Sequence, residues 1–277
     1  MRKLLTTLSV ATALALTVSI GAAQDRRQLP RSAPTLVHSH EAGFKEVAPG
    51  VSKAVLWEGP DKQSYGAWIK FEPRTDAGLH TYTKDIWIVV IHGAYVYSDG
   101  AGEKRVGPGD YIRIPGGTKH RGSGDANWGA LFYEESSASA VTSSADDAQS
   151  RQQPPKGAPT FVSVDEARFT EVAPGVSKVV LWGDQNKGPY GAFTKFDPEF
   201  DAGRHTHTSD VWIVVTQGFY LYNDDAGEKR LGAGDFMRIP AGTEHRSGGD
   251  KKWGVIFYEA SHGKFDFVPE RGIGVGR

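Results

Sequence analysis

The residues best suited to chemistry are three histidines in the second half of the chain. His205 and His207 are separated by one residue, and Asp210 follows them. Side chains two positions apart on a β-strand point to the same face, so both imidazoles can bind one metal ion. A third imidazole, His245, follows a glycine turn, a short strand and a Pro-x-Gly turn that begin at Gly234. We therefore predict a metal site formed by His205, His207 and His245, with Asp210 adding an oxygen ligand after a short bend.

This ligand set predicts one divalent transition metal. Imidazoles with a carboxylate suit Fe, Mn, Ni, Cu or Zn, and the pattern leaves the identity open. Open coordination positions would accept oxygen or a small substrate that binds through two oxygens. Histidines that only hydrogen-bond within a core are the alternative interpretation. The spacing, the strand phase and the Pro-Gly-His turn agree in favouring the metal.

The same pattern occurs 125 residues earlier with one change. His80, Asp85 and His120 match His205, Asp210 and His245, but Tyr82 stands where the second copy has His207. A tyrosine is a poor neutral ligand, because it must lose a proton whose ordinary pKa is ~10. The first copy is therefore either a weak metal site built by two histidines and Asp85 or a structural domain without metal. We favour the structural domain and predict about one metal ion per chain.

The chain is a duplication. Positions 33–136 align with 158–261 without a gap, and about 60% of the aligned positions are identical, at a period far longer than the roughly 20 to 50 residues of solenoid repeats. The predicted domains are 33–136 and 158–262. A Ser-, Ala-, Gln- and Pro-rich linker at 137–157 joins them, and a tail at 263–277 follows.

Each copy reads as an all-β unit, a sandwich or small barrel. Short runs rich in Val, Ile and aromatic residues are separated by Gly, Pro, Asn and Asp, and no helical period follows the N-terminal segment. In the second copy the expected strands are 177–182, 190–196, 211–216, 219–222, 236–239 and 253–258.

The N-terminal segment predicts export. Arg2 and Lys3 precede an apolar run from Leu4 to Ile20, and small residues extend to Ala23. This is typical of a signal peptide at 1–23, cleaved after Ala23, for a periplasmic or secreted protein with no membrane anchor afterwards. An uncleaved anchor is the alternative, but the run is short for a bilayer, which needs about 20 residues.

The composition narrows the function. The formal net charge is −1 with 23% charged residues, so no strong field draws the chain to nucleic acid. The absence of cysteine excludes disulfides, thiolate ligands and thiol nucleophiles. No Gly-rich dinucleotide turn or Gly-x-Ser-x-Gly elbow is present, which argues against nucleotide-dependent enzymes and serine hydrolases.

These motifs resemble those of the cupin superfamily. Its second motif, Gly-x5-Pro-x-Gly-x2-His, is matched from Gly234 to His245 and again from Gly109 to His120. The first motif fits His205 and His207, but the family's glutamate position falls on Val211, with Asp210 one residue early. The Pro-Gly-Val-Ser-Lys and Arg-Ile-Pro-x-Gly-Thr runs are similar to those of the cupin sensor domains of zinc anti-sigma factors.

The resemblance implies two tandem jelly-roll barrels, a bicupin, that bind metal. It implies a metal-dependent enzyme, such as a dioxygenase that acts on a small hydroxylated or carboxylated molecule. A cupin lyase, isomerase or decarboxylase and a non-catalytic metal- or ligand-sensing module are the alternatives. Arg238 and Trp212 are candidates for a substrate pocket, although a structural ion pair is the simpler role for Arg238. Apolar sheet faces of the two barrels are expected to pack together, and they offer a surface for a homo-oligomer.

Overall fold

The computed structural model describes residues 33–59, 64–136, 142–144 and 157–270. The predicted signal peptide at 1–23 and most of the predicted linker at 137–157 lie outside the described residues, so both stay predictions. Within the described ranges, none of the helical structure is long and apolar enough to span a membrane. The one helical element described is a 3-10 turn, Ser39–Glu41.

The described part is otherwise built of strands, most of them short and bounded by turns. The first copy contributes β1 (Thr35–His38), β2 (Lys45–Ala48), β3 (Val51–Glu58), β4 (Tyr65–Phe71), β5 (Asp76–Tyr82), β6 (Ile86–Gly93), β7 (Tyr95–Asp99), β8 (Gly102–Val106), β9 (Tyr111–Ile114), β10 (His120–Gly124) and β11 (Ala130–Ser136), followed by β12 (Thr142–Ser144). The second copy contributes β13 (Thr160–Val162), β14 (Thr170–Ala173), β15 (Val176–Gly183), β16 (Tyr190–Phe196), β17 (His205–Thr206), β18 (Val211–Gly218), β19 (Tyr220–Asp224), β20 (Gly227–Leu231), β21 (Asp235–Ile239), β22 (Arg246–Gly249), β23 (Val255–Ser261) and β24 (Val268–Pro269).

Each barrel has one large antiparallel sheet that faces one or two smaller antiparallel sheets. In the first barrel a seven-stranded sheet, β13-β9-β6-β11-β4-β3-β2, faces a five-stranded sheet, β12-β5-β10-β7-β8. In the second, the seven-stranded sheet β1-β21-β18-β23-β16-β15-β14 faces the three-stranded sheet β20-β19-β22 and the short pair β17-β24. The expected all-β fold with two tandem jelly-roll barrels is confirmed.

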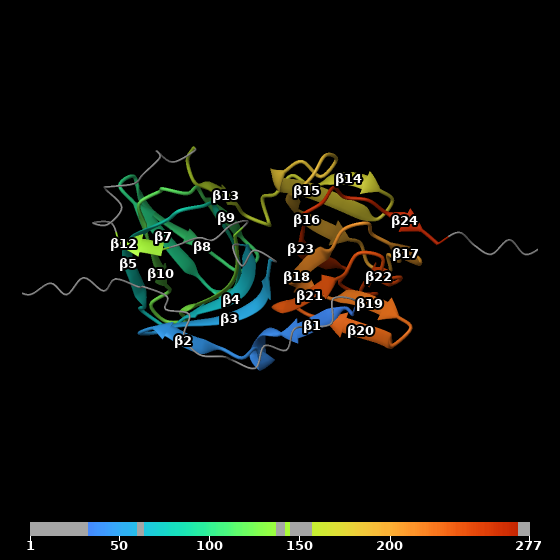
Figure 1. Ribbon diagram of the computed structural model, residues 1–277, viewed down its shortest axis with the longest axis horizontal. Helices are drawn as coiled ribbons and strands as arrows, with labels where there is room; N and C mark the ends of the chain where they lie inside the picture. The colour runs from blue at the N-terminus through green and yellow to red at the C-terminus, as the bar shows by residue number, and fades with distance from the viewer. Residues whose placement is uncertain (1–32, 60–63, 137–141, 145–156, 271–277) are drawn as a thin grey trace, which may run out of the picture.

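The two barrels exchange their first strands. β1 belongs to the first copy but pairs with β21 of the second, where Leu36 lies opposite Met237. β13 belongs to the second copy but pairs with β9 of the first, where Phe161 lies opposite Ile112. Figure 1 shows β1 in blue beside the orange strands and β13 beside β9. Each barrel is therefore completed by a strand from the other copy, a connection that the repeat boundaries alone do not reveal.

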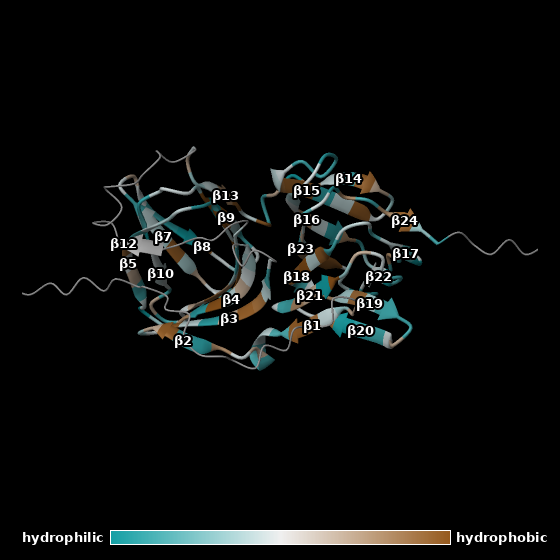
Figure 2. Cartoon of the chain, in the orientation of Figure 1, coloured by the Kyte–Doolittle hydropathy of each residue, from teal (hydrophilic) through white to brown (hydrophobic). Residues whose placement is uncertain are grey.

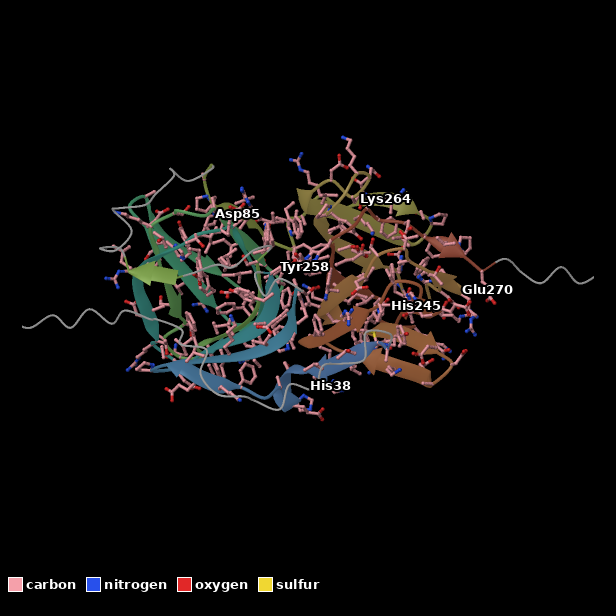
Figure 3. The ribbon with its side chains drawn as sticks, viewed as in Figure 1. His38, Asp85, His245, Tyr258, Lys264 and Glu270 are labelled. Carbon is pink, nitrogen blue, oxygen red and sulfur yellow. The ribbon has the colours of Figure 1, made fainter. Side chains whose placement is uncertain are left out.

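The two seven-stranded sheets pack against each other through aromatic side chains. Trp57 stacks on Trp212 with ring centroids 4.8 Å apart, and Trp87 stacks on Trp182 at 4.5 Å. Tyr258 lies between the barrels in Figure 3. Figure 2 shows hydrophobic colour on β3 and β4, whereas β20 at the outer edge is hydrophilic. Side chains alternate along each strand, so the opposite face of each large sheet lines the interior of its own barrel.

Candidate metal centre

His205 and His245 face each other across a narrow backbone ladder. The two residues exchange both backbone hydrogen bonds, from His205 N to His245 O at 2.9 Å and from His245 N to His205 O at 3.0 Å. Their ring centroids lie 4.3 Å apart. His207 follows directly after β17, its carbonyl accepts the Gly242 backbone N–H at 2.8 Å, and its ring centroid lies 5.0 Å from that of His205. The strand and the Pro-Gly turn thus bring together the three histidines that the motifs predict.

Backbone carbonyls fix which nitrogen of each ring is free. Nδ1 of His205 bonds Gly203 O at 2.8 Å, Nδ1 of His207 bonds Asp266 O at 2.6 Å, and Nδ1 of His245 bonds Thr243 O at 2.9 Å. A carbonyl oxygen only accepts, so each Nδ1 carries the proton and donates. Nε2 of all three rings is therefore the nitrogen with an available lone pair, which is the state a metal ligand needs.

Burial keeps the imidazoles of His205 and His245 neutral. His205 and His245 are 2% and 1% exposed. Burial lowers the pKa of His205 to about 4, opposed in part by the bond to the Gly203 carbonyl. Burial, together with the neighbouring histidines, lowers the pKa of His245 to about 4. Both rings remain neutral ligands at pH 7, and protons compete with a metal only in acid.

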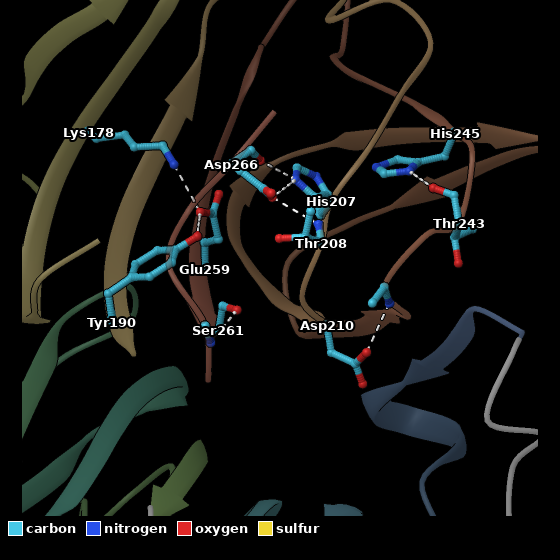
Figure 4. A network of polar contacts seen from close by, with 12 residues as sticks. Lys178, Tyr190, His207, Thr208, Asp210, Thr243, His245, Glu259, Ser261 and Asp266 are labelled. Atoms are coloured by element: carbon cyan, nitrogen blue, oxygen red, sulfur yellow. Dashed lines mark hydrogen bonds and ion pairs between the residues drawn. The ribbon is translucent and has the colours of Figure 1, made fainter. Parts of the chain in front are cut away.

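The three rings form a group that can hold a metal ion. One nitrogen from each ring belongs to a set whose members all lie within 4.8 Å of one another. Nε2 of His245 is buried and makes no hydrogen bond in the described part of the chain. A buried polar atom without a partner is costly, so it fits a ligand that completes the site, although Nε2 of His120 in the first barrel is unpartnered in the same way. Figure 4 shows the rings of His207 and His245 pointing toward one another. The donor set fits a borderline transition metal.

Asp210 is not brought to the histidines. Its Oδ2 accepts Nε and Nη2 of Arg238 at 2.9 and 2.5 Å, and its Oδ1 accepts the Ala241 backbone N–H at 2.9 Å. In the first barrel Asp85 makes the same contacts with Arg113 at 2.9 and 2.6 Å and with the Gly116 N–H at 3.0 Å. The expectation that Asp210 completes the metal shell is therefore corrected. Each carboxylate binds the Pro-Gly turn through Oδ1 and the arginine of the neighbouring strand through Oδ2. It therefore anchors the turn to that strand.

The two candidate pocket residues face the other barrel. Arg238 is engaged by Asp210, so the structural ion pair is the role the structure shows. Trp212 is 5% exposed and stacks on Trp57 of the first copy, with His262 at a ring-centroid distance of 4.5 Å. On the strand, Trp212 alternates with Val211 and Ile213, which pack inside the second barrel. Trp212 therefore belongs to the contact between barrels and not to a pocket above the histidines.

In the first barrel, Tyr82 fills the place of the missing imidazole. His80 and His120 again face each other, with ring centroids 4.3 Å apart, and their Nδ1 atoms bond Gly78 O and Thr118 O at 2.9 and 3.0 Å. The Tyr82 hydroxyl donates to Glu134 Oε2 at 3.3 Å. Burial and the Glu134 charge raise the pKa of Tyr82 well above its usual value, so the phenol keeps its proton in the metal-free site.

A buried polar cluster beside the histidines was missed by the sequence reasoning. Glu259 accepts Lys178 Nζ at 2.9 Å and the Tyr190 hydroxyl on Oε1, while the Thr194 hydroxyl donates to Oε2 at 3.3 Å. In Figure 4, Glu259 lies with Lys178 and Tyr190 on one side and His207 and Asp266 on the other. Burial opposes ionisation, but Lys178 and Tyr190 leave the pKa of Glu259 below its usual value. A signal existed, because Lys178, Tyr190 and Glu259 recur as Lys53, Tyr65 and Glu134 in otherwise apolar strands.

The segment 262–270 crosses the same end of the second barrel, and we call it the C-terminal strap. Its β24 pairs with β17, and the Phe265 N–H bonds Gln185 O at 2.7 Å. Asp266 binds the His207 ring through its carbonyl and the Thr208 N–H through Oδ1 at 2.9 Å. Phe267 stacks on His205 at 4.4 Å. The repeat ends at position 261, yet the barrel extends to 270, because the strap supplies one wall of the site.

Comparisons with known proteins agree with this architecture. Residues 32–138 match the family model of a ChrR cupin-like domain, and residues 166–273 match the model of a domain of unknown function, DUF4437. No curated protein matches the chain in sequence.

Several solved structures share the fold across most of the chain. The oxalate decarboxylase of Lactobacillus farciminis, in complex with formate, has a TM-score of 0.57 at 14% identity and covers 87% of this chain and 90% of its own. A mutant of the salicylate 1,2-dioxygenase of Pseudoaminobacter salicylatoxidans, in complex with gentisate, has a TM-score of 0.62 at 12% identity and covers 84% and 82%. A mutant of the oxalate decarboxylase of Bacillus subtilis has a TM-score of 0.56 at 16% identity and covers 87% and 81%.

Proposed function

We propose that this chain, which matches a ChrR cupin-like domain over residues 32–138 and shares the two-barrel fold of metal-dependent cupin enzymes, is a metal-dependent enzyme whose second barrel holds the ion. The carrying observation is that His205, His207 and His245 each donate Nδ1–H to a backbone carbonyl. The three Nε2 atoms are thereby left as ligands for one divalent transition metal. A bound ion would polarise an oxygen of the substrate and supply a redox centre if it is Fe, Mn or Cu.

We favour a dioxygenase that acts on a small hydroxylated or carboxylated molecule. A site with three protein ligands and no carboxylate leaves several coordination positions for oxygen and for a substrate that binds through two oxygens. The likeness to a salicylate dioxygenase crystallised with gentisate supports this choice, and the likeness to oxalate decarboxylases supports the lyase alternative. Both likenesses lie at 12% to 14% identity and concern the fold.

The residues of this chain would hold the ion, orient the substrate and limit the access of water. The three histidines fix the ion against β17 and the Pro-Gly turn. Phe265 and Phe267 restrict water on the strap side, with the Phe265 ring centroid 6.2 Å from that of His207 and 3.7 Å from Lys178 Nζ. Tyr190, Lys178 and Glu259 place a charged, hydrogen-bonded cluster beside the histidines, where a bound substrate would meet it.

The test is turnover with defined metals. The protein is loaded in turn with Fe(II), Mn(II) and Zn(II) and supplied with catechols, 1,2-diketones and small organic acids, while oxygen uptake and product mass are recorded. We expect oxygen uptake with a redox-active metal, lost in His207→Ala and retained in the control His92→Ala, an exposed histidine outside the site. Carbon dioxide release without oxygen uptake would support the decarboxylase instead. A metal-loaded chain that is inert with every metal would support the non-catalytic binding module.

A further inference from the structure

The carboxylate beside the histidines receives a different set of donors in each barrel. In the first barrel, Glu134 accepts the Tyr65 hydroxyl on Oε1 at 2.6 Å and the Tyr82 hydroxyl on Oε2 at 3.3 Å. In the second barrel, Glu259 Oε1 accepts Tyr190 and Lys178, and Oε2 accepts the Thr194 hydroxyl at 3.3 Å. No phenol reaches Glu259 Oε2 within the described residues. A carboxylate has about four acceptor sites, so Glu259 retains capacity for a further donor.

Tyr82 shows what kind of group fits at this place. Its ring stacks on His120 at 5.7 Å and lies edge-on to His80 at 5.3 Å, while its hydroxyl reaches the carboxylate. A phenol is longer than an imidazole, so the Tyr82 hydroxyl extends past the point where the ring of a histidine ends. In the second barrel, His207 stands at this position and Glu259 at that of Glu134, so no phenol of the described part of the chain joins the two. The first barrel thus contains an internal copy of a phenol bound to the site.

The walls of the second site suit a planar ring. Phe267, which is 43% exposed, stacks on His205, and Phe265 lies edge-on to Tyr190 at 6.3 Å with Lys178 Nζ 3.7 Å from its ring centroid, so aromatic side chains flank the histidines on the strap side. Glu259 and Lys178 are buried, with side chains 8% and 5% exposed. Aromatic walls with one charged acceptor select a ring compound with a hydroxyl donor over a purely aliphatic anion.

We propose that Glu259, held in place by Lys178 and Tyr190, is the hydrogen-bond acceptor that recognises a catechol-type ligand in the second barrel. One oxygen of the ligand binds the ion, and the neighbouring hydroxyl donates to Glu259. This assignment rests on the proposed function, since the first oxygen needs the ion. It places substrate recognition on β15, β16 and β23, whereas the metal ligands come from β17, the residue after it and the Pro-Gly turn.

The experiment measures binding to the full chain loaded with Zn(II), which is redox-inert and prevents turnover. Catechol and 2-methoxyphenol, in which one hydroxyl is methylated, are titrated by calorimetry into wild type, Glu259→Gln and the matched variant Glu134→Gln of the first barrel. We expect one catechol per wild-type chain and affinity at least ~10-fold weaker for Glu259→Gln, since the lost hydrogen bond is to a charged group. Glu134→Gln should bind as wild type does, and the two phenols should differ less in Glu259→Gln than in wild type.

Zinc content separates the ways in which the proposal can fail. If wild type and Glu259→Gln each carry one zinc and bind catechol equally, Glu259 is not the acceptor and only this inference is wrong. If wild type carries no zinc, the proposed metal centre itself is wrong. Should Glu259→Gln not fold, the two phenols on wild type still decide: at least ~10-fold weaker binding of 2-methoxyphenol supports the second hydroxyl contact, and equal binding overturns it.

Discussion

Tyr82 and His207 occupy equivalent positions in the two barrels and present different atoms to the histidines around them. The His207 ring is turned by the Asp266 carbonyl so that Nε2 remains free. The Tyr82 hydroxyl instead donates to Glu134, and burial keeps it protonated. The remaining histidines, His80 and His120, have the same Nδ1 contacts as their counterparts in the second barrel. At the scale of single residues, this one side chain is the difference on which the predicted preference of the metal for the second barrel rests.

Restoring the imidazole should restore the site. We expect Tyr82→His to raise metal content from about one to about two ions per chain, because Nε2 of His80 and His120 is already the free nitrogen. Elemental analysis after dialysis measures it. Tyr82→Phe is the matched control, since it removes the hydroxyl without adding a ligand. If Tyr82→His still binds a single ion, the first barrel is excluded from metal binding by something other than this residue.

Asp210 should matter for stability and not for metal content. Asp210→Asn removes the charge that pairs with Arg238, and we expect a loss of about 1 to 3 kcal/mol in the free energy of unfolding. Metal content should stay at the wild-type value, because Asp210 has no contact with the histidines. Denaturant unfolding and elemental analysis check the two parts. A loss of metal with unchanged stability would restore Asp210 as a ligand.

At the scale of elements, the C-terminal strap supports the metal centre from outside the repeat. The Asp266 carbonyl holds His207, and its side chain is fixed by the Thr208 N–H. Asp266→Ala keeps this carbonyl but removes the side-chain bond to Thr208 that holds it in place, so we expect metal affinity to weaken by up to roughly 10-fold. Competition with a chromogenic chelator measures it. Lys264→Ala, an exposed change on the same strap, serves as control. Equal affinities in both variants would show that the strap does not position His207.

The strands and the three histidines could be predicted from the sequence because local patterns determine them. The expected strand 190–196 matches β16, and 211–216 matches most of β18. Asp210 was misassigned because its partner, Arg238, is distant in the sequence and only the fold shows their contact. Trp212 was assigned to the wrong face because its strand is buried on both faces. The sequence of such a strand looks the same whether a given face lines the barrel interior or packs against the other barrel. The role of Glu259 depends on three strands that meet only in the folded barrel.

At the scale of the whole molecule, the exchanged strands make each barrel depend on the other copy. Leu36 packs inside the second barrel, and Phe161 packs inside the first. We expect Leu36→Ala to cost about 2 kcal/mol and to speed amide hydrogen exchange in β21, whereas Phe161→Ala should act on β9. Exchange measured by mass spectrometry distinguishes the two. If amide hydrogen exchange became faster only in strands of the mutated copy, the barrels would not share their first strands.

The contact between barrels also carries a titrating carboxyl group. Glu135 is 1% exposed and accepts the hydroxyls of Tyr258 and Tyr133 at 3.1 and 3.3 Å. Burial raises the pKa of Glu135 from its ordinary 4.5 to about 7, although both tyrosines oppose the shift. Between these values the folded chain keeps a proton that the unfolded chain has released. The free energy of unfolding therefore falls as pH rises through this window, by about 3 kcal/mol from this group.

Replacing the carboxyl group should remove that dependence. Relative to wild type, we expect Glu135→Gln to gain about 3 kcal/mol in the free energy of unfolding between pH 4 and pH 8. The histidines titrate equally in both proteins, so the difference isolates Glu135. Denaturant unfolding at several pH values measures it, with the exposed change Glu171→Gln as control. A constant difference across the range would show that Glu135 has the same pKa in the folded and the unfolded chain.

The account depends most on a single functional metal centre in a two-barrel chain. Its most direct test is elemental analysis of protein purified without added metal, with wild type compared with His207→Ala and the control His92→Ala. We predict about one transition-metal ion per chain in wild type and in His92→Ala, and close to none in His207→Ala. Two equally tight ions per wild-type chain, or one ion that survives in His207→Ala, would contradict the assignment of the site to the second barrel.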